Sequence, residues 1–314
     1  MKWTSGISHF LYSVFAKAGI AALLSLAAPS FAQPPAAPQG GAPGAPGARP
    51  PAVGNGGAPA FFGGPPHVPG GPVQHLPDGH PDMQGFWNSA NNGGAVFELQ
   101  NHPKGRRPFF GPGKGAIVDP ADGFIPYTPE AAAKAKETFE NHLADEPELH
   151  CYESGVPKQM YVQFGFQIFQ PANYVVLTWE FMHAYRIIPT DGRPHIPANI
   201  KLFQGDSVGH WEGDTLVVDT TNLSDRTWFD TVGNFHSDAE HVVERFTPVD
   251  TTTVKYEAIV EDPKVLTKPF KMAMDLNRTV DPKYEQMEFG CVEGNQDVKH
   301  YTKDKGGAAD VKVK

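Results

Sequence analysis

Several features that mark common protein classes are missing from this sequence. It has 2 cysteines in 314 residues, and it contains no GxSxG nucleophile elbow, no P-loop and no dinucleotide glycine fingerprint. A serine nucleophile of that type, nucleotide hydrolysis and nucleotide binding on a Rossmann fold therefore have no support in the sequence.

Long apolar runs are also scarce. The run Ala18–Ala28 is shorter than the roughly 20 residues that a membrane span needs, and no later run is long enough. Lys2 and Lys17 precede this run, and Ser30-Phe31-Ala32 supplies small residues around a cleavage site. The sequence thus predicts a signal peptide over residues 1–32, no transmembrane span, and a periplasmic or secreted protein.

Positive charge is in short supply. The chain has 26 Lys and Arg against 35 Asp and Glu, a formal net charge of −9. Lys2 and Lys17 are the charged residues of the predicted signal, so its removal takes the net charge from −9 to −11. Nucleic acid and anionic membrane surfaces are poor partners for such a chain. We expect a small-molecule ligand as partner, and the oligomeric state stays open.

The composition divides the chain into segments. Residues 33–76 are almost entirely Pro, Gly and Ala, which cannot bury enough apolar surface to offset their ordering entropy, so we expect a disordered linker. Residues 77–305 hold nearly all the aromatic and β-branched residues and have the length of a single β domain. The segment 306–314 is predicted to be a frayed tail.

Strand patterns dominate that domain. Tyr161–Gln170 and Tyr174–Ile188 are rich in aromatic and branched residues, and in the second run alternation places Trp179 and His183 on one face with Arg186 on the other. Asp191-Gly192, which follows, is predicted to be a hairpin turn. Further strands are expected at 216–220, 241–249, 253–261, 268–280 and 284–292.

The fold class follows from these elements. One short helix is predicted near 128–142, because Thr128 can serve as its N-cap, Pro129 suits its first position and alanines follow. Successive strands with short turns otherwise indicate an all-β protein, an antiparallel lipocalin-like barrel or a related sandwich.

The two cysteines both lie in the β domain. In an oxidising compartment Cys151 and Cys291 are most simply a disulfide, which would contribute about 4–5 kcal/mol in the chain-entropy model. A reactive or metal-bound thiolate and two unpaired buried thiols are the alternatives.

The densest titratable patch is Trp228–Phe246, with two histidines, four acids and one arginine in 19 residues. His236 and His241 are the candidate general acid and base, because imidazole titrates near neutral pH. Asp230 could orient one of them, and Arg245 could hold a substrate carboxylate or a developing negative charge.

A local turn is expected to bring the two histidines together. Ser237 and Glu240 fit a capping box, so one helical turn would begin at Ser237. Glu244 is a second residue that could orient a histidine. The structural alternative is that Ser237 and Glu240 only cap a turn while Glu244 and Arg245 are solvated or paired.

Metal and ligand sites are weaker predictions. His236 and His241, with His183 or His210, could form a three-histidine metal site, although no HExxH motif is present. We predict no organic cofactor, and a transition metal stays an alternative. The candidate ligand-binding residues, each with a core role as the alternative, are Trp179, His183, Trp211 and Trp228.

An ordered set of motifs spans residues 78–295. These are CYESGVP at 151–157, YRIIPTDGR at 185–193, SVGHWEGDTLVVDT at 207–220 and the HSxxxHxxERF pattern at 236–246, followed by Asp262-Pro263 and Cys291-Val292-Glu293. In this the chain resembles a family of uncharacterised secreted bacterial proteins. The resemblance implies export and a single domain, and it adds no reaction.

Together these observations predict an exported small-molecule enzyme. It would use histidine acid–base chemistry, as a lyase, isomerase or hydrolase, on a hydrophobic or aromatic substrate held in a β-barrel cavity. A non-catalytic periplasmic ligand-binding or carrier protein is one alternative. A structural envelope protein, for which the Pro/Gly linker argues, is the other.

Overall fold

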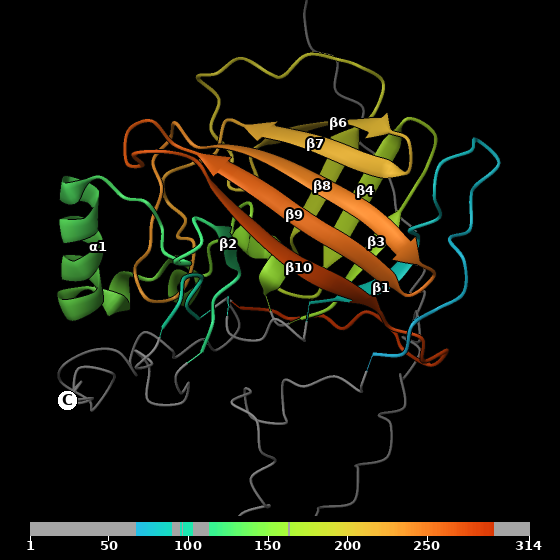
Figure 1. The fold of residues 1–314 in the computed structure, drawn as a ribbon, viewed down its shortest axis with the longest axis horizontal. Coiled ribbons are helices and arrows are strands. Elements are labelled where there is room, and N and C mark those ends of the chain that lie inside the picture. The colour runs from blue at the N-terminus through green and yellow to red at the C-terminus, as the bar shows by residue number, and fades with distance from the viewer. Residues whose placement is uncertain (1–66, 90–94, 96, 103–112, 163, 292–314) are drawn as a thin grey trace, which may run out of the picture. The chain divides into compact units, whose positions relative to one another are not determined.

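Nine strands of the computed structural model follow one another around a barrel in chain order (Figure 1). The first strand pairs with the last, as β1 pairs with β10, and a short additional strand, β2 (Ile117–Asp119), pairs with β10 beside the ring. The prediction of an all-β antiparallel barrel is therefore confirmed. The barrel strands are β1 (Gly85–Asn88), β3 (Phe166–Phe169), β4 (Tyr174–Trp179), β5 (Tyr185–Pro189), β6 (Asp206–Glu212), β7 (Thr215–Thr221), β8 (His241–Asp250), β9 (Thr253–Glu261) and β10 (Phe270–Arg278).

The structure describes residues 67–89, 95, 97–102, 113–162 and 164–291. They belong to one compact unit of the chain, Ala52–Lys314. The predicted signal peptide, most of the predicted linker and the predicted tail lie outside the described residues. Within the described part, no helix is both long and apolar enough to cross a membrane.

The ring stays open between β5 and β6, and we call this opening the seam. All eight pairings between neighbouring barrel strands are antiparallel. Nine strands linked in this way leave β5 and β6 pointing in the same direction, so a tight hairpin cannot join them. Residues 190–205 instead run the length of the barrel. The hairpin turn predicted at Asp191-Gly192 is therefore wrong, because it begins this long crossover.

The barrel interior is packed with side chains. Inward and outward residues alternate along β8 and β9, as the sequence pattern predicted for this hairpin. Val254, Tyr256, Ala258 and Val260 have no exposed area. A water-sized void would expose the side chains that line it, so none borders these four residues. Burying each large apolar side chain contributes about 1.5–3 kcal/mol before entropy is counted.

The predicted helix is present as α1 (Pro129–Asn141) at one end of the barrel (Figure 1). Thr128 caps it, because its hydroxyl oxygen accepts a hydrogen bond from the backbone N–H of Ala131 at 3.2 Å. A backbone bridge between Tyr127 and Leu266 fixes the start of the helix against the β9–β10 connection. Three short 3-10 helices follow it: η2 (Leu143–Asp145), η3 (Pro147–His150) and η4 (Lys158–Tyr161).

The run 174–188 is two strands rather than one. Met182 and His183 have left-handed backbones, with φ of 60° and 52°, and the N–H of Trp179 donates to the carbonyl of Ala184 at 2.9 Å. This tight turn resets the alternation. Arg186 consequently faces the interior and His183 is exposed, so both side chains lie on the face opposite to the one predicted.

The C-terminal strand predicted at 284–292 is also wrong for its described residues. Phe289 makes an isolated bridge to Phe181, and Glu180 holds the segment instead of a ladder. The Glu180 carboxylate accepts from the Tyr284 hydroxyl at 2.5 Å and from the Met287 N–H at 2.9 Å.

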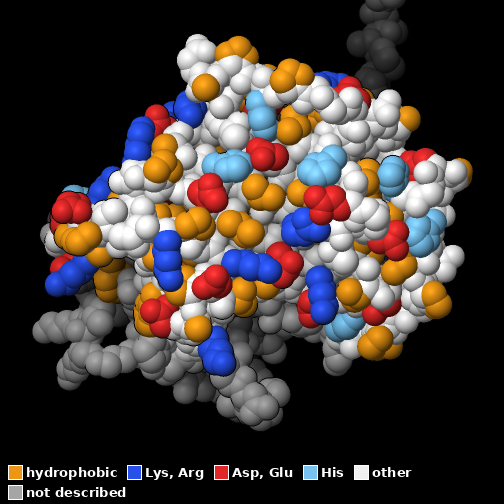
Figure 2. Space-filling model, turned by 45° about the horizontal axis from the view of Figure 1, so that its top comes forward, with side chains coloured by type: hydrophobic (Ala, Val, Ile, Leu, Met, Phe, Trp, Pro, Cys, Tyr) orange, Lys and Arg blue, Asp and Glu red, His pale blue; other side chains and the backbone are white. Residues whose placement is uncertain are grey.

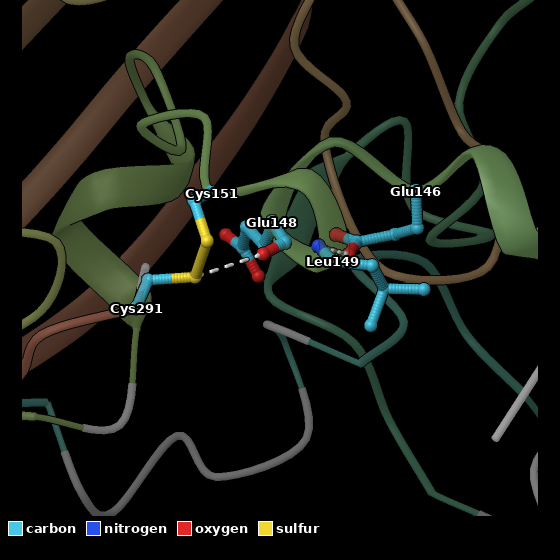
Figure 3. The surroundings of a disulfide bond; sticks show 5 residues. All are labelled: Glu146, Glu148, Leu149, Cys151 and Cys291. Atoms are coloured by element: carbon cyan, nitrogen blue, oxygen red, sulfur yellow. Dashed lines mark hydrogen bonds between the residues drawn. A yellow bond between two sulfur atoms is a disulfide. The ribbon is translucent and has the colours of Figure 1, made fainter. Parts of the chain in front are cut away.

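The disulfide between Cys151 and Cys291 is confirmed, with the two Cα atoms 5.5 Å apart across 140 residues of sequence. It ties the C-terminal segment to the end of η3. Figure 3 shows the sulfur of Cys291 beside the carbonyl oxygen of Glu148, at 3.7 Å. In the same view the Glu146 carboxylate accepts the N–H of Leu149 at 3.1 Å.

Part of the predicted linker is described and makes hydrogen bonds. The N–H of Gly71 donates to the Thr251 hydroxyl at 3.0 Å, and the Thr252 hydroxyl donates to the carbonyl of Val68 at 2.9 Å. Residues 67–71 thus lie along the turn between β8 and β9, which supplies the hydrogen-bond partners that their own composition lacks.

Candidate functional site

Arg186 on β5 links the strands across the seam from inside the barrel. Its Nη1 donates to Glu244 at 2.9 Å, its Nε to Ser207 at 2.9 Å and its Nη2 to Thr220 at 2.7 Å and to Glu244. The Tyr256 hydroxyl donates to the same carboxylate at 2.9 Å. We call these five residues the seam network, and all of them are at least 95% buried.

The carboxylate of the seam network has its hydrogen bonds satisfied, and the strands around it are closely packed. Both oxygens of Glu244 accept hydrogen bonds, and burial together with this carboxylate raises the pKa of Tyr256 well above its ordinary value. Gly209 on β6 lacks a side chain where β5 comes close, since a Cβ there would lie 2.9 Å from Ile188. Glu244 therefore holds the barrel together. Glu244 is thus paired, as the structural alternative of the sequence analysis expected, and its carboxylate binds Arg186 rather than orienting a histidine.

A second buried cluster lies in the connection between β7 and β8. The Thr227 hydroxyl is 2.7 Å from His236 Nε2, and His236 Nδ1 is 2.7 Å from the Glu240 carboxylate. We call Thr227, His236 and Glu240 the end site, because their loop lies at the barrel end that carries α1, where Gly233 packs against Thr138. The three residues of the end site are between 1% and 3% exposed.

Hydrogen-bond partners define the tautomer of His236. Its Nδ1 faces only acceptors, the Glu240 carboxylate at 2.7 Å and the carbonyl of Ser237 at 3.1 Å, so this nitrogen carries the proton. In the neutral ring Nε2 is then an acceptor, and the single hydrogen of the Thr227 hydroxyl has two acceptors within reach, His236 Nε2 at 2.7 Å and the carbonyl of Ser224 at 3.4 Å. This is the relation of nucleophile, base and orienting carboxylate found in catalytic triads.

The electrostatics of the end site are unbalanced. Burial lowers the pKa of His236, but the Glu240 carboxylate outweighs burial, and the pKa ends above its ordinary value. Burial raises the pKa of Glu240. Among the described residues Glu240 Oε1 has no hydrogen-bond partner, and Oε2 makes an ion-pair contact with His236 that is not aligned as a hydrogen bond. Such unpartnered buried atoms are rare in packed proteins.

Neighbouring groups fix the backbone around His236. The Tyr127 hydroxyl donates to the carbonyl of Phe235 at 2.7 Å, and Asp262 accepts from the N–H and the hydroxyl of Ser237 at 2.6 and 2.8 Å. The predicted capping box at Ser237 is wrong, because Glu240 turns to His236 and the chain enters β8 at His241 without a helical turn.

Asp230 organises the loop that carries the end site. Its carboxylate accepts from the N–H groups of Leu99, Val232 and Asn234 at 2.9–3.2 Å and from the Asn234 amide at 2.5 Å. Burial raises the pKa of Asp230. These hydrogen bonds go to Leu99, Val232 and Asn234 rather than to His236, so Asp230 is an anchor of the loop.

His241 and Arg245 lie on the outer face of the sheet. His241 Nε2 is 3.0 Å from one oxygen of Asp219, and His195 Nε2 is 2.9 Å from the other, while Arg245 pairs with Glu212 at 2.8 Å. Figure 2 shows histidine side chains beside acidic ones on the face over β6 to β9. The structure therefore separates His241 and Arg245 from His236, with which the sequence grouped them.

The candidate ligand-binding residues are dispersed. Trp179 is 3% exposed and packs on Phe166, Trp211 stacks on His80 with ring centres 4.5 Å apart, and Trp228 bridges to Phe235. Trp179, Trp211 and Trp228 thus pack against different parts of the chain.

The candidate metal ligands are dispersed as well. His183 lies 3.3 Å from Glu288, whereas His236 and His241 face Glu240 and Asp219. Within the described ranges, no group of three His, Cys, Asp or Glu residues is placed to hold a metal ion.

Thr227 and Gly155 were missed by the sequence reasoning. Gly155 has φ of +75°, and a Cβ there would lie 2.7 Å from the Thr227 hydroxyl oxygen and 3.1 Å from the carbonyl oxygen of Phe203. Only glycine lets this backbone cover the hydroxyl. Thr227 stands one residue before the patch 228–246, and no spacing in the sequence marks it.

A buried ion cluster supports the backbone that carries Gly155. Lys158, 1% exposed, lies 2.9 Å from Glu146 and 2.8 Å from Glu148, and the Ser154 hydroxyl donates to Glu148 at 2.6 Å. Burial lowers the pKa of Lys158, but the two carboxylates raise it further, so the amine stays charged. Ser154 and Lys158, on either side of Gly155, are thereby linked to Glu146 and Glu148.

Two glutamines beside Gly155 present unpartnered amide atoms. The N–H of Gln159 donates to the carbonyl of Gly155 at 2.7 Å, and Gln204 follows Phe203 in the chain. Gln204 donates to Gln159 at 3.3 Å, which leaves Gln159 Nε2 and Gln204 Oε1 buried and without partners among the described residues. They offer one donor and one acceptor near the end site.

Comparisons with known proteins add little to this geometry. No protein-family model matches the chain, and no curated protein does. A crystal structure of a mutant of the fluorescent protein UnaG matches 44% of this chain and 89% of that chain, with 12% sequence identity and a TM-score of 0.24. An overlap with so low a TM-score carries no argument about a ligand or an activity.

Proposed function

We propose that this protein is a histidine-dependent hydrolase of small aromatic esters. The observation that supports this proposal is the row of contacts from the Thr227 hydroxyl through His236 to the Glu240 carboxylate. The Thr227 Oγ1–His236 Nε2 distance and the His236 Nδ1–Glu240 distance are both 2.7 Å. Of the lyase, isomerase and hydrolase chemistries that a histidine base can serve, this arrangement favours the hydrolase because it activates a hydroxyl nucleophile.

The reaction follows from the placement of the three side chains. Thr227 Oγ1 bonds to the acyl carbon of the ester while its proton moves to His236 Nε2, and Glu240 stabilises the imidazolium that forms. The C–O bond to the leaving alcohol then breaks as that alcohol takes the proton. Water attacks the acyl-threonine, again giving its proton to His236, and the carboxylic acid leaves as Thr227 regains its hydrogen.

The proposal places the substrate at the barrel end rather than in a central cavity. The four interior residues of β9 without exposed area support this choice, since no water-sized void borders them. Thr227 is 1% exposed beneath Gly155, so the substrate reaches it when residues 152–155 move aside. That movement is limited because Cys151 is held by the disulfide.

We also propose that the protein is exported. The signal-like sequence at residues 1–32 argues for it, and the Cys151–Cys291 disulfide suits an oxidising compartment. Membership of the secreted bacterial family that the motifs resemble is likewise proposed, on the motifs alone.

Acyl transfer from 4-nitrophenyl acetate tests the hydrolase. We expect turnover by the wild type, and an acetyl group on the tryptic peptide 227–245 after rapid acid quench and mass spectrometry. Thr227→Val removes the hydroxyl with little change of volume and should abolish both signals. Thr215→Val, which alters another buried threonine that bonds to Thr247, is the matched control and should keep them.

The variant His236→Gln separates catalysis from incidental acetylation. A glutamine cannot accept the proton of Thr227 and pass it on, so acetylation of the peptide should stop while the fold remains. Equal acetyl transfer in wild type, Thr227→Val and His236→Gln would show that surface groups react and would overturn the proposed function.

A further inference from the structure

Arg226, next to Thr227 in the chain, lies against two aromatic rings. Its guanidinium carbon is 4.3 Å from the ring centre of Tyr152 and 5.6 Å from that of Phe203. The two rings stack on each other with centres 5.3 Å apart and planes 26° apart, and Arg226 donates a hydrogen bond to the Tyr152 hydroxyl. A planar cation is thus held in place by π contacts.

The charge of Arg226 is not compensated by an acid. Arg186, Arg193 and Arg245 each pair with a carboxylate, whereas Arg226 has no carboxylate within ion-pair distance among the described residues. Glu153, which is next to Tyr152 in the chain, has a pKa raised by burial. An exposed, oriented guanidinium without a counter-ion is suited to bind an anion, and its fork matches a carboxylate.

The position of this cluster connects it to the end site. Gly155 faces the Thr227 hydroxyl and the carbonyl of Phe203, which a Cβ at this position would meet at 2.7 and 3.1 Å, and Tyr152 belongs to the same short segment. A ligand whose carboxylate binds Arg226 and whose ring replaces the stacking of Tyr152 on Phe203 would displace that segment. Binding at the cluster and access to Thr227 are therefore coupled.

We infer that Arg226, Tyr152 and Phe203 form a subsite for the free carboxylate of an aromatic substrate. This inference rests on the proposed function for the identity of the reacting bond, and it narrows the substrate class to aromatic esters that carry a carboxylate on the ring. Arg226 takes the anion-binding role that the sequence assigned to Arg245, whose own charge is neutralised by Glu212.

Equilibrium binding tests the subsite without requiring turnover. Isothermal titration calorimetry of the full mature protein would compare 4-hydroxybenzoate with 4-hydroxybenzamide. The first carries the carboxylate that Arg226 is inferred to bind, and the second carries a neutral amide in its place. We expect the wild type to bind the benzoate at least tenfold more tightly. Arg226→Gln should remove this difference, and Thr227→Val, which lacks the nucleophile, should keep it.

Arg193 provides a matched control. It also lies over an aromatic ring, with its guanidinium 5.2 Å from the ring centre of Tyr174, but Asp191 neutralises it. Arg193→Gln should leave the tenfold preference unchanged. Equal affinity of the wild type for the two probes, or a preference that survives Arg226→Gln, would overturn the subsite. An Arg226-dependent preference without any hydrolysis of 4-nitrophenyl acetate would support the subsite and overturn the proposed function.

Discussion

Two buried acids in this barrel have different surroundings. Glu244, in the seam network, receives hydrogen bonds on both oxygens from Arg186 and Tyr256. Glu240, in the end site, contacts His236 and leaves Oε1 without a partner among the described residues. Both side chains are almost fully buried, so burial alone does not distinguish them.

The difference separates a group that holds the fold from one that is available for chemistry. A buried charge with every partner in place is held rigidly, whereas one with an open position retains an unsatisfied interaction that a proton or substrate can use. The seam network also joins five strands, β5 to β9, while the end site lies in a single connection between strands. We expect mutations in the first to change stability and mutations in the second to change activity.

Removing one acid from the seam network is expected to have the largest effect. Glu244→Leu leaves Arg186 charged and buried without its counter-ion, which should lower the free energy of unfolding by about 3–5 kcal/mol. Urea denaturation followed by circular dichroism measures this loss. The double variant Arg186→Met with Glu244→Leu removes both charges and should recover most of it. A loss below about 1 kcal/mol in the single variant would contradict the role of the seam.

Two glycines offer a second contrast. A methyl group at Gly209 would press on Ile188 across the seam, so Gly209→Ala should cost about 1–3 kcal/mol of stability with unchanged activity. Gly155→Ala places a Cβ against the Thr227 hydroxyl at a left-handed position, which costs about 1–2 kcal/mol and should lower kcat/KM by about 100-fold. Parallel unfolding and hydrolysis assays compare them, and equal activities would contradict the end site.

Local patterns in the sequence predicted much of the fold. The Thr128 cap, the β8–β9 hairpin and the alternation along its strands depend on neighbours within a few residues, and these were confirmed. The break between β4 and β5 was missed because Met182 and His183 adopt left-handed backbones that their residue types do not indicate. The parallel relation of β5 and β6 follows from the number of strands, which no local window contains.

The candidate site was predictable only in part. His236 stood out because titratable residues crowd its segment, but Glu240 was read as a capping residue, and the choice between the two roles depends on where Asp262 packs. Thr227 and Gly155 are 72 positions apart and meet only in the folded chain. No arrangement of residues along the sequence reports such a contact.

Two buried threonines, one in each network, allow the same comparison with a smaller expected loss of stability. Thr220 bonds to Arg186 in the seam network, and Thr227 bonds to His236 in the end site. Each threonine replaced by valine loses one buried hydrogen bond, worth about 1–3 kcal/mol where a partner is left unsatisfied. Only Thr227→Val should also reduce kcat/KM, by about 1,000-fold or more. Activity lost in Thr220→Val with native stability would reverse the assignment of the two networks.

The smallest expected effect is a pH dependence in which the free energy of unfolding and kcat/KM change in opposite directions. Because the pKa of His236 is raised in the folded state, its stabilisation is present in full below the unfolded value near 6.5 and is lost as pH rises through the folded value. Each unit of such a shift corresponds to about 1.4 kcal/mol. The neutral ring is the form that accepts the proton of Thr227, so kcat/KM should rise over the same interval in which stability falls.

The variant His236→Gln isolates this contribution. Its free energy of unfolding, measured by urea denaturation from pH 6 to 9, should fall less steeply than that of the wild type above pH 6.5, because the variant has no imidazole to lose a proton. His183→Gln, at an exposed histidine beside Glu288, should follow the wild type. If stability and kcat/KM instead rose together in the wild type, the group that titrates would not be the one that activates Thr227. The end site would then hold the loop in the way that the seam network holds the barrel.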